Sequence, residues 1–124
     1  MIRAAVAVCC LFTGAVSAAL AGDVEIIDVR YERNEVGRYT FHVALRHKDE
    51  GWDHYADKWQ VLSPEGEVLG ERVLLHPHVN EQPFTRSLSE VAIPSDVREV
   101  VIRAHDPVHG WSDDERRVLL ETNR

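Results

Sequence analysis

The segment Tyr39-Thr40-Phe41-His42-Val43-Ala44-Leu45-Arg46 decides the fold class, because large apolar side chains stand at every second position along it. Alternation with a period of two places successive side chains on opposite faces of a β-strand. No stretch after residue 22 shows the sustained three-to-four-residue apolar period of an amphipathic helix. The sequence therefore predicts an all-β domain.

Six other segments show strand features and are separated by turn residues. The predicted strands cover residues 24–31, 39–45, about 54–62, 67–75, 84–93, 97–105 and about 115–121, with a bulge expected at Ile27-Asp28. Ser63-Pro64-Glu65-Gly66 and Pro94-Ser95-Asp96 are typical of tight turns. About seven antiparallel strands in about a hundred residues favour a two-sheet sandwich.

Residues 1–21 are similar to a secretory signal peptide, with Arg3, an uncharged apolar run and small residues ending at Ala21. We predict cleavage after Ala21, and a retained anchor is the alternative. A lipoprotein signal is disfavoured because Val8, rather than a small residue, precedes Cys9. The two cysteines would leave with this segment, which excludes disulfides and Cys-type metal sites from a mature chain that is periplasmic or secreted.

The predicted mature chain, residues 22–124, has the length of one domain. Removing Arg3 leaves 13 basic and 21 acidic residues, a formal net charge of −8. Such a balance repels phosphate backbones and anionic membrane surfaces, so we expect neither nucleic acid nor membrane as a partner after cleavage. An exported protein, a small ligand or a metal ion is favoured instead.

Two features resemble a known family. The run from Val100 to Gly110, VVIRAHDPVHG, is similar to the F strand and F–G turn of fibronectin type III and related immunoglobulin-like domains, and Trp59 matches their core tryptophan on strand C. The chain also resembles small exported bacterial proteins. The resemblance implies an immunoglobulin-like sandwich over residues 22–124, without the inter-sheet disulfide of antibody domains, and implies no activity.

Strand counting predicts which loops lie together. If consecutive strands are antiparallel, the loops after the second, fourth and sixth strands emerge at one end of the sandwich. Six of the seven histidines fall in or beside these loops, whereas the loops at the other end contain none. Loops gathered at one end of a sandwich commonly form its binding surface.

The predicted metal ligands are histidines of this end. In extended backbone, His76 and His78 would point to one side and form half of a site for zinc or copper(II). The other candidate ligands are His54, His105 and His109, with Asp106 as a further possibility. The alternative is that these histidines cap strand ends and bond only to loop backbone.

The predicted surface for recognition of a partner or ligand consists of Trp52, Arg86, Trp111 and His109. Exposed aromatic rings there could stack on a peptide, a sugar or a cation, and Arg86 could hold a carboxylate. The alternatives are an aromatic lid over the core and pairing of Arg86 with Glu81. The acids of these loops, such as Asp49, are expected to be solvated charges.

The sequence offers little for catalysis, since the mature chain has no cysteine, nucleophile elbow, phosphate loop or His-Glu-x-x-His motif. We therefore predict a protein that is not an enzyme. The leading interpretation is an exported binding or accessory module that uses one loop end of the sandwich. The alternatives are a histidine-based zinc or copper(II) protein and a structural subunit of the envelope.

Overall fold

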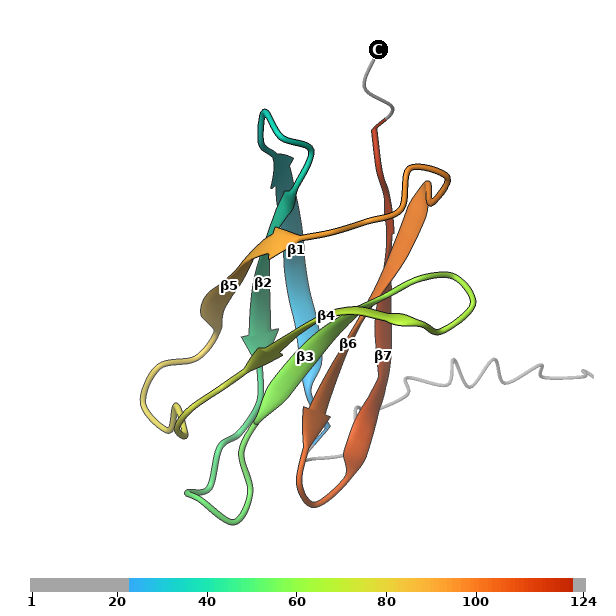
Figure 1. Ribbon diagram of the computed structural model, residues 1–124. Coiled ribbons are helices and arrows are strands. Elements are labelled where there is room, and N and C mark those ends of the chain that lie inside the picture. Colours follow the sequence, from blue (N-terminus) through green and yellow to red (C-terminus); the bar gives the residue numbers. More distant parts are fainter. Residues whose placement is uncertain (1–22, 122–124) are drawn as a thin grey trace, which may run out of the picture.

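The computed structural model describes residues 23–121, which form seven strands (Figure 1). The predicted signal peptide, residues 1–21, lies outside the described residues. The strands are β1 (Glu25–Arg33), β2 (Tyr39–Arg46), β3 (Lys58–Leu62), β4 (Val68–Val73), β5 (Phe84–Val91), β6 (Glu99–Asp106) and β7 (Gly110–Leu119). Within residues 23–121, no helix has the length and apolar character that a membrane span requires.

The strands form two sheets, one with the order β1-β2-β5 and one with the order β4-β3-β6-β7. Every neighbouring pair is antiparallel. The apolar faces of the two sheets enclose a common core. The molecule is therefore an all-β sandwich of seven antiparallel strands, as the sequence predicted.

The core consists of the inward-facing rows of the central strands. Phe41, Val43 and Leu45 of β2 lie opposite Trp59 and Val61 of β3, and all five are fully buried. Burial of each large apolar side chain stabilises the fold by about 1.5–3 kcal/mol. Trp59 thus occupies the core position that was expected for it.

Two strands begin well away from their predicted starts. β3 begins at Lys58, not His54, because Gly51 has a φ of 105° and opens a turn in which the His54 carbonyl accepts from the Glu50 amide. β7 begins at Gly110, not Glu115, because a three-residue turn brings Trp111 directly opposite His105. Trp111 therefore lies in a strand, which corrects its predicted place in a loop.

Side chains join β1 to β7 at the open edge between the sheets. The expected bulge follows Ile26, whose amide donates to Asp114 Oδ2 at 2.7 Å and whose carbonyl accepts from Arg116 at 2.7 Å. Farther along, the hydroxyl of Tyr31 accepts from the amide of Glu121 at 2.8 Å. These bonds hold the beginning and the end of the domain together.

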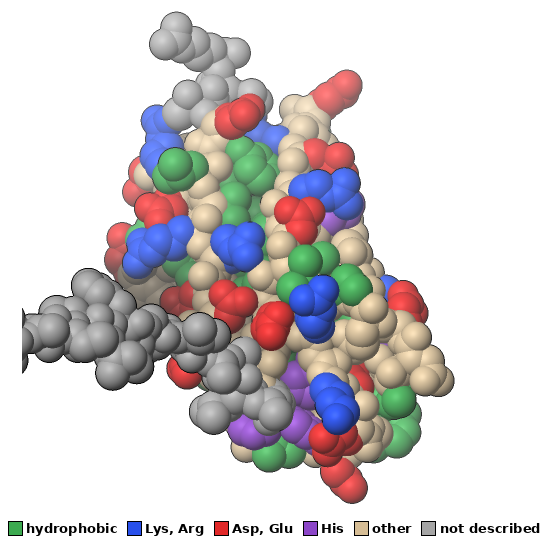
Figure 2. Space-filling view, turned by 180° about the vertical axis from the view of Figure 1, so that it is seen from behind, with side chains coloured by type: hydrophobic (Ala, Val, Ile, Leu, Met, Phe, Trp, Pro, Cys, Tyr) green, Lys and Arg blue, Asp and Glu red, His purple; other side chains and the backbone are tan. Residues whose placement is uncertain are grey.

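The loops after β2, β4 and β6 lie at the lower end of Figure 1. Figure 2 shows histidine side chains gathered at this same end of the molecule. A ring nitrogen of His54 in the first loop lies 3.2 Å from one of His109 in the third. The second loop is joined to the first through the amide of His78, which donates to Asp49 Oδ2 at 2.6 Å.

Candidate metal centre

The inward-facing row of β2 continues beyond the end of the strand. After Phe41, Val43 and Leu45, the next alternate residues are His47 and Asp49, and both are buried as well. A row of core side chains therefore ends in an imidazole and a carboxylate. Polar groups at such positions need partners, because burial without hydrogen bonds is costly.

The inward-facing row of β6 ends in the same way. Val100, Ile102 and Ala104 are followed by Asp106, whose exposure is 1%. Because β2 and β6 belong to different sheets, the two rows meet across the end of the sandwich. Their polar ends face each other, with 3.5 Å between His47 Nε2 and Asp106 Oδ2.

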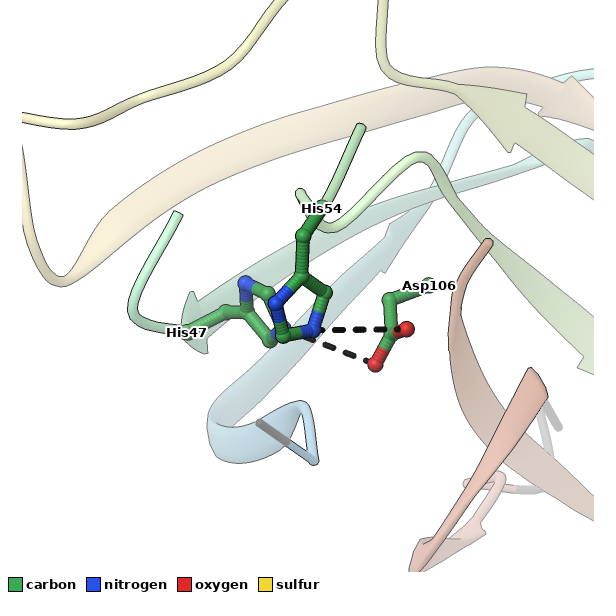
Figure 3. A group of neighbouring side chains, drawn as sticks. All are labelled: His47, His54 and Asp106. Carbon is green, nitrogen blue, oxygen red and sulfur yellow. Dashed lines mark ion pairs between the residues drawn. The ribbon is translucent and has the colours of Figure 1, made fainter. Parts of the chain in front are cut away.

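Two loop histidines complete this cluster, which we call the end cluster: His47, His54, Asp106 and His109. His54 Nε2 lies 3.6 Å from Asp106 Oδ1 and 3.2 Å from His109 Nδ1. His109 Nδ1 in turn lies 3.2 Å from Asp106 Oδ2. Figure 3 shows how His47 and His54 point toward the carboxylate of Asp106.

The contacts within the end cluster are close to the ligand spacing of a metal site, and one donor atom each of His47, His54 and Asp106 lies within 4.8 Å of the others. A zinc ion with four ligands at 2.0–2.1 Å holds neighbouring donor atoms about 3.3–3.4 Å apart. The four contacts of the end cluster span 3.2–3.6 Å. At 3.2 Å, one of the two facing nitrogens of His54 and His109 donates and the other accepts, so this contact joins the two rings directly.

Asp49 supports the end cluster from behind. Its carboxylate accepts from His47 Nδ1 at 2.5 Å and from the amides of Ala56 and His78. With Nδ1 donating to Asp49, Nε2 of a neutral His47 is the atom that would ligate. In metal sites, a carboxylate commonly accepts from the other ring nitrogen of a ligating histidine and so fixes the orientation and tautomer of its ring.

Both carboxylates are stabilised as anions. Burial opposes ionisation of Asp106, but the amide and ring of His109 and the amide of Val108 outweigh it and lower the pKa of Asp106. In the same way, burial raises the pKa of Asp49 less than its bonds from His47, His78 and Ala56 lower it. Two buried anions therefore flank one buried imidazole, an excess of negative charge that favours a cation.

His76 and His78 do not join the end cluster. Their rings are 4.6 Å apart, but His78 stacks on Phe84 and its Nε2 lies 2.8 Å from a guanidinium nitrogen of Arg86. Since a guanidinium only donates, that nitrogen of His78 must accept and is not available to a metal. Burial and then the charge of Arg86 lower the pKa of His78, which keeps its ring neutral.

The other predicted residues lie in three different settings. His105 Nδ1 bonds Asp57 at 2.6 Å, and its ring packs edge-on against Trp111. Trp111 is covered by the guanidinium of Arg103, 3.9 Å from the ring centroid. Trp52 is 68% exposed at the tip of the first loop. Of the five predicted metal ligands, His54 and His109 lie in the end cluster.

The sequence interpretation missed the role of His47 and took Asp49 for a solvated charge, whereas its exposure is 5%. The signal was present in the alternation of the chain. Continued past Leu45, the core-facing positions are 47 and 49, and continued past Ala104 the next is Asp106. Extending both rows would have placed all three inside the sandwich.

Comparison with known proteins adds one relative to this β-sandwich. No family model matches the chain, and no solved structure matches it. A protein of Halomicrobium mukohataei that carries the name "Putative lipoprotein" is 40% identical over 89 residues. The match covers 72% of this chain and 43% of that protein, so the chain spans less than half the length of its relative.

Proposed function

We propose that this protein binds a divalent transition metal ion through His47, His54, Asp106 and His109. Four contacts of 3.2–3.6 Å among three imidazoles and one ionised carboxylate carry the proposal. The bond from His47 to Asp49, which orients the His47 ring, supports it further.

Zinc fits this donor set best. Imidazole nitrogens suit zinc and copper(II) and do not suit calcium or magnesium, which prefer oxygen ligands. Copper(II) favours tetragonal geometry, whereas donor contacts of 3.2–3.6 Å are close to the ligand spacing of a tetrahedral zinc site. Copper(II) remains the second metal to test.

We further infer that the protein is an exported, immunoglobulin-like module. The order β7-β6-β3-β4 corresponds to the G-F-C-C′ order of the larger sheet in variable-type domains, and Trp59 of β3 then falls on strand C. The signal-like residues 1–21 and the lipoprotein name of the relative support export, free or membrane-anchored.

Recognition of a partner protein is a second candidate function, favoured by exposed apolar side chains beside the end cluster. The three loops together expose Trp52, Leu75, Val79 and Val108. Each of these side chains is more than half exposed, and exposed apolar side chains mark an interaction surface where they form a contiguous patch. Equal recovery of exported partners by wild type and Trp52→Ala in a pull-down would contradict this function.

Titration of the full-length chain with zinc tests metal binding directly. A ligand that binds only the folded state at about 100 times its Kd adds about 2.7 kcal/mol to the free energy of unfolding. We therefore expect zinc to raise the melting temperature of wild type and to have no such effect on His54→Ala. The matched control is His42→Ala, because His42 lies on β2 and bonds Ser87 and Glu32, outside the end cluster.

The same titration at several pH values tests whether imidazole groups hold the metal. Imidazole must be neutral to bind a metal, so the zinc-induced rise should shrink as the pH falls below about 6.5. No rise with zinc or copper(II), or an equal rise in wild type and His54→Ala, would overturn the proposal.

A further inference from the structure

A fifth potential ligand approaches the end cluster from the beginning of the domain. A carboxylate oxygen of Asp23 lies within 4.8 Å of donor atoms of both Asp106 and His109. Those two residues already belong to the end cluster, so one metal ion between them would have Asp23 beside it. No pattern in the sequence singled out Asp23, which is 83 positions from Asp106.

The backbone around Asp23 is held in place by contacts of its own. The adjacent Val24 is buried in the core with an exposure of 1%. Two residues farther on, the amide and the carbonyl of Ile26 are both bonded by side chains of β7. The backbone that follows Asp23 is therefore fixed, and its carboxylate already lies within 4.8 Å of donor atoms of Asp106 and His109.

We propose that Asp23 is an additional ligand of the metal and that metal binding thereby fixes the start of the domain to the β6–β7 turn. This inference rests on the proposed metal site. Its chemistry is favourable, because carboxylate oxygens are common zinc ligands and, among the direct ligands, Asp106 and Asp23 would together balance the charge of one divalent ion. Five donors are also within the coordination range of zinc.

The consequence is a coupling between metal occupancy and the N-terminal entry of the chain. Asp23 follows directly on the residues that precede the domain, so a metal bound to Asp23, Asp106 and His109 joins that entry to a turn between two other strands. By linkage, the factor by which metal binding favours the position of Asp23 near the cluster is also the factor by which fixing Asp23 there would tighten metal binding.

Cobalt(II) is a suitable probe, because its visible absorption distinguishes four-coordinate from five-coordinate sites. We expect Asp23→Asn in the full-length chain to weaken cobalt(II) binding at least about tenfold, as loss of supporting groups does in other metal sites. Its spectrum should gain the greater intensity of a four-coordinate ion. Asp28→Asn is the matched control, since Asp28 lies on β1 close to Asp23 in sequence, with its side chain 58% exposed and 3.5 Å from Arg30.

Amide hydrogen exchange tests the coupling separately. We expect zinc to slow exchange at Val24 and Glu25 in wild type and in Asp28→Asn, and to have no effect there in Asp23→Asn. Ligation by His54, His109 and Asp106 should still slow exchange in the β6–β7 turn of all three proteins.

The outcomes distinguish this inference from the proposed function. Unchanged affinity, spectrum and exchange in Asp23→Asn, with binding lost in His54→Ala, would overturn the role of Asp23 and leave the four-ligand site standing. Failure of wild type to bind either metal would overturn both. Weaker binding with an altered spectrum in Asp23→Asn alone supports the fifth ligand.

Discussion

At the end of the sandwich formed by residues 34–38, 63–67 and 94–97, each turn is held by hydrogen bonds within itself. The Gly37 amide donates to the Asn34 carbonyl at 3.0 Å, and the Gly66 amide to the Ser63 carbonyl at 2.9 Å. At the opposite end, buried or half-buried bonds join separate loops, such as Asp49 to His78 and His54 to His109, which are 29 and 55 positions apart. One end is held mainly by local turn bonds, with one exposed contact of 3.4 Å from Asn34 to Glu90, whereas the other is a polar network that joins its loops.

The difference separates two ways of closing a sandwich. Local turns cost little to order and depend on no distant contact. The network at the histidine end buries charged groups whose partners come from other loops, so each part depends on the others. Burial of charged groups costs free energy, and groups of this kind with shifted pKa values are concentrated at functional sites.

The largest expected effect is loss of the carboxylate that joins the first two loops. Asp49→Ala removes three hydrogen bonds and leaves His47 buried beside the remaining charges. We expect the free energy of unfolding to fall by about 3–5 kcal/mol in urea denaturation. Asn34→Ala, which removes a turn bond of 2.8 Å at the other end, should cost about 1 kcal/mol. Equal losses would contradict the contrast between the two ends.

A smaller effect should appear on acidification. Folding lowers the pKa of His78. At a pH below the pKa of about 6.5 that His78 has in the unfolded chain, the unfolded chain therefore binds a proton at His78 more readily than the folded chain does. Stability should therefore be full above about pH 6.5 and fall as the pH drops toward the lowered folded pKa. His78→Gln should flatten this part of the profile, measured by urea denaturation between pH 8 and 5. A profile that is unchanged in the variant would contradict it.

The lowered pKa values of Asp49 and Asp106 act in a separate range. Their contribution to stability is present above the unfolded value of about 3.8–3.9 and is lost as the pH falls below it. His78→Gln should leave this second decline in place. The decline in stability that begins near pH 6.5 therefore reports on His78 in the second loop. The decline at lower pH reports on Asp49 and Asp106.

These effects involve the residues that the sequence predicted least well. The strands, the bulge, the turns and the core position of Trp59 follow from alternation and from local turn chemistry, which act over a few residues. The gathering of six histidines at one end also follows from strand counting. The contacts of His47 with Asp106 could not be predicted in this way, because they depend on how one sheet lies over the other.

Local reasoning failed for a related reason at Trp111 and Asp49. The predicted loop before β7 was too long because a tight turn of residues 107–109 was not anticipated, and Trp111 consequently lies against Arg103 in the sheet. Asp49 follows a lysine and precedes a glutamate, a setting typical of solvated loops. Only the two-residue alternation from Leu45 indicates its burial.

The smallest expected effect concerns the exposed loop tips. Trp52→Ala at the histidine end and Val36→Ala at the other end should each change the free energy of unfolding by no more than about 0.5 kcal/mol, because both side chains are largely exposed. Thermal melting of the two variants measures this. A large loss for Trp52→Ala would show that its contact with Tyr55 belongs to the stabilising network.

The bonds from β7 to Ile26 have a consequence for solubility. An edge strand with unpaired backbone groups is a template on which another chain can add a strand and begin aggregation. At Ile26, Asp114 and Arg116 occupy both the donor and the acceptor of the β1 edge. Two charged side chains thus protect the beginning of β1 from strand addition by another chain.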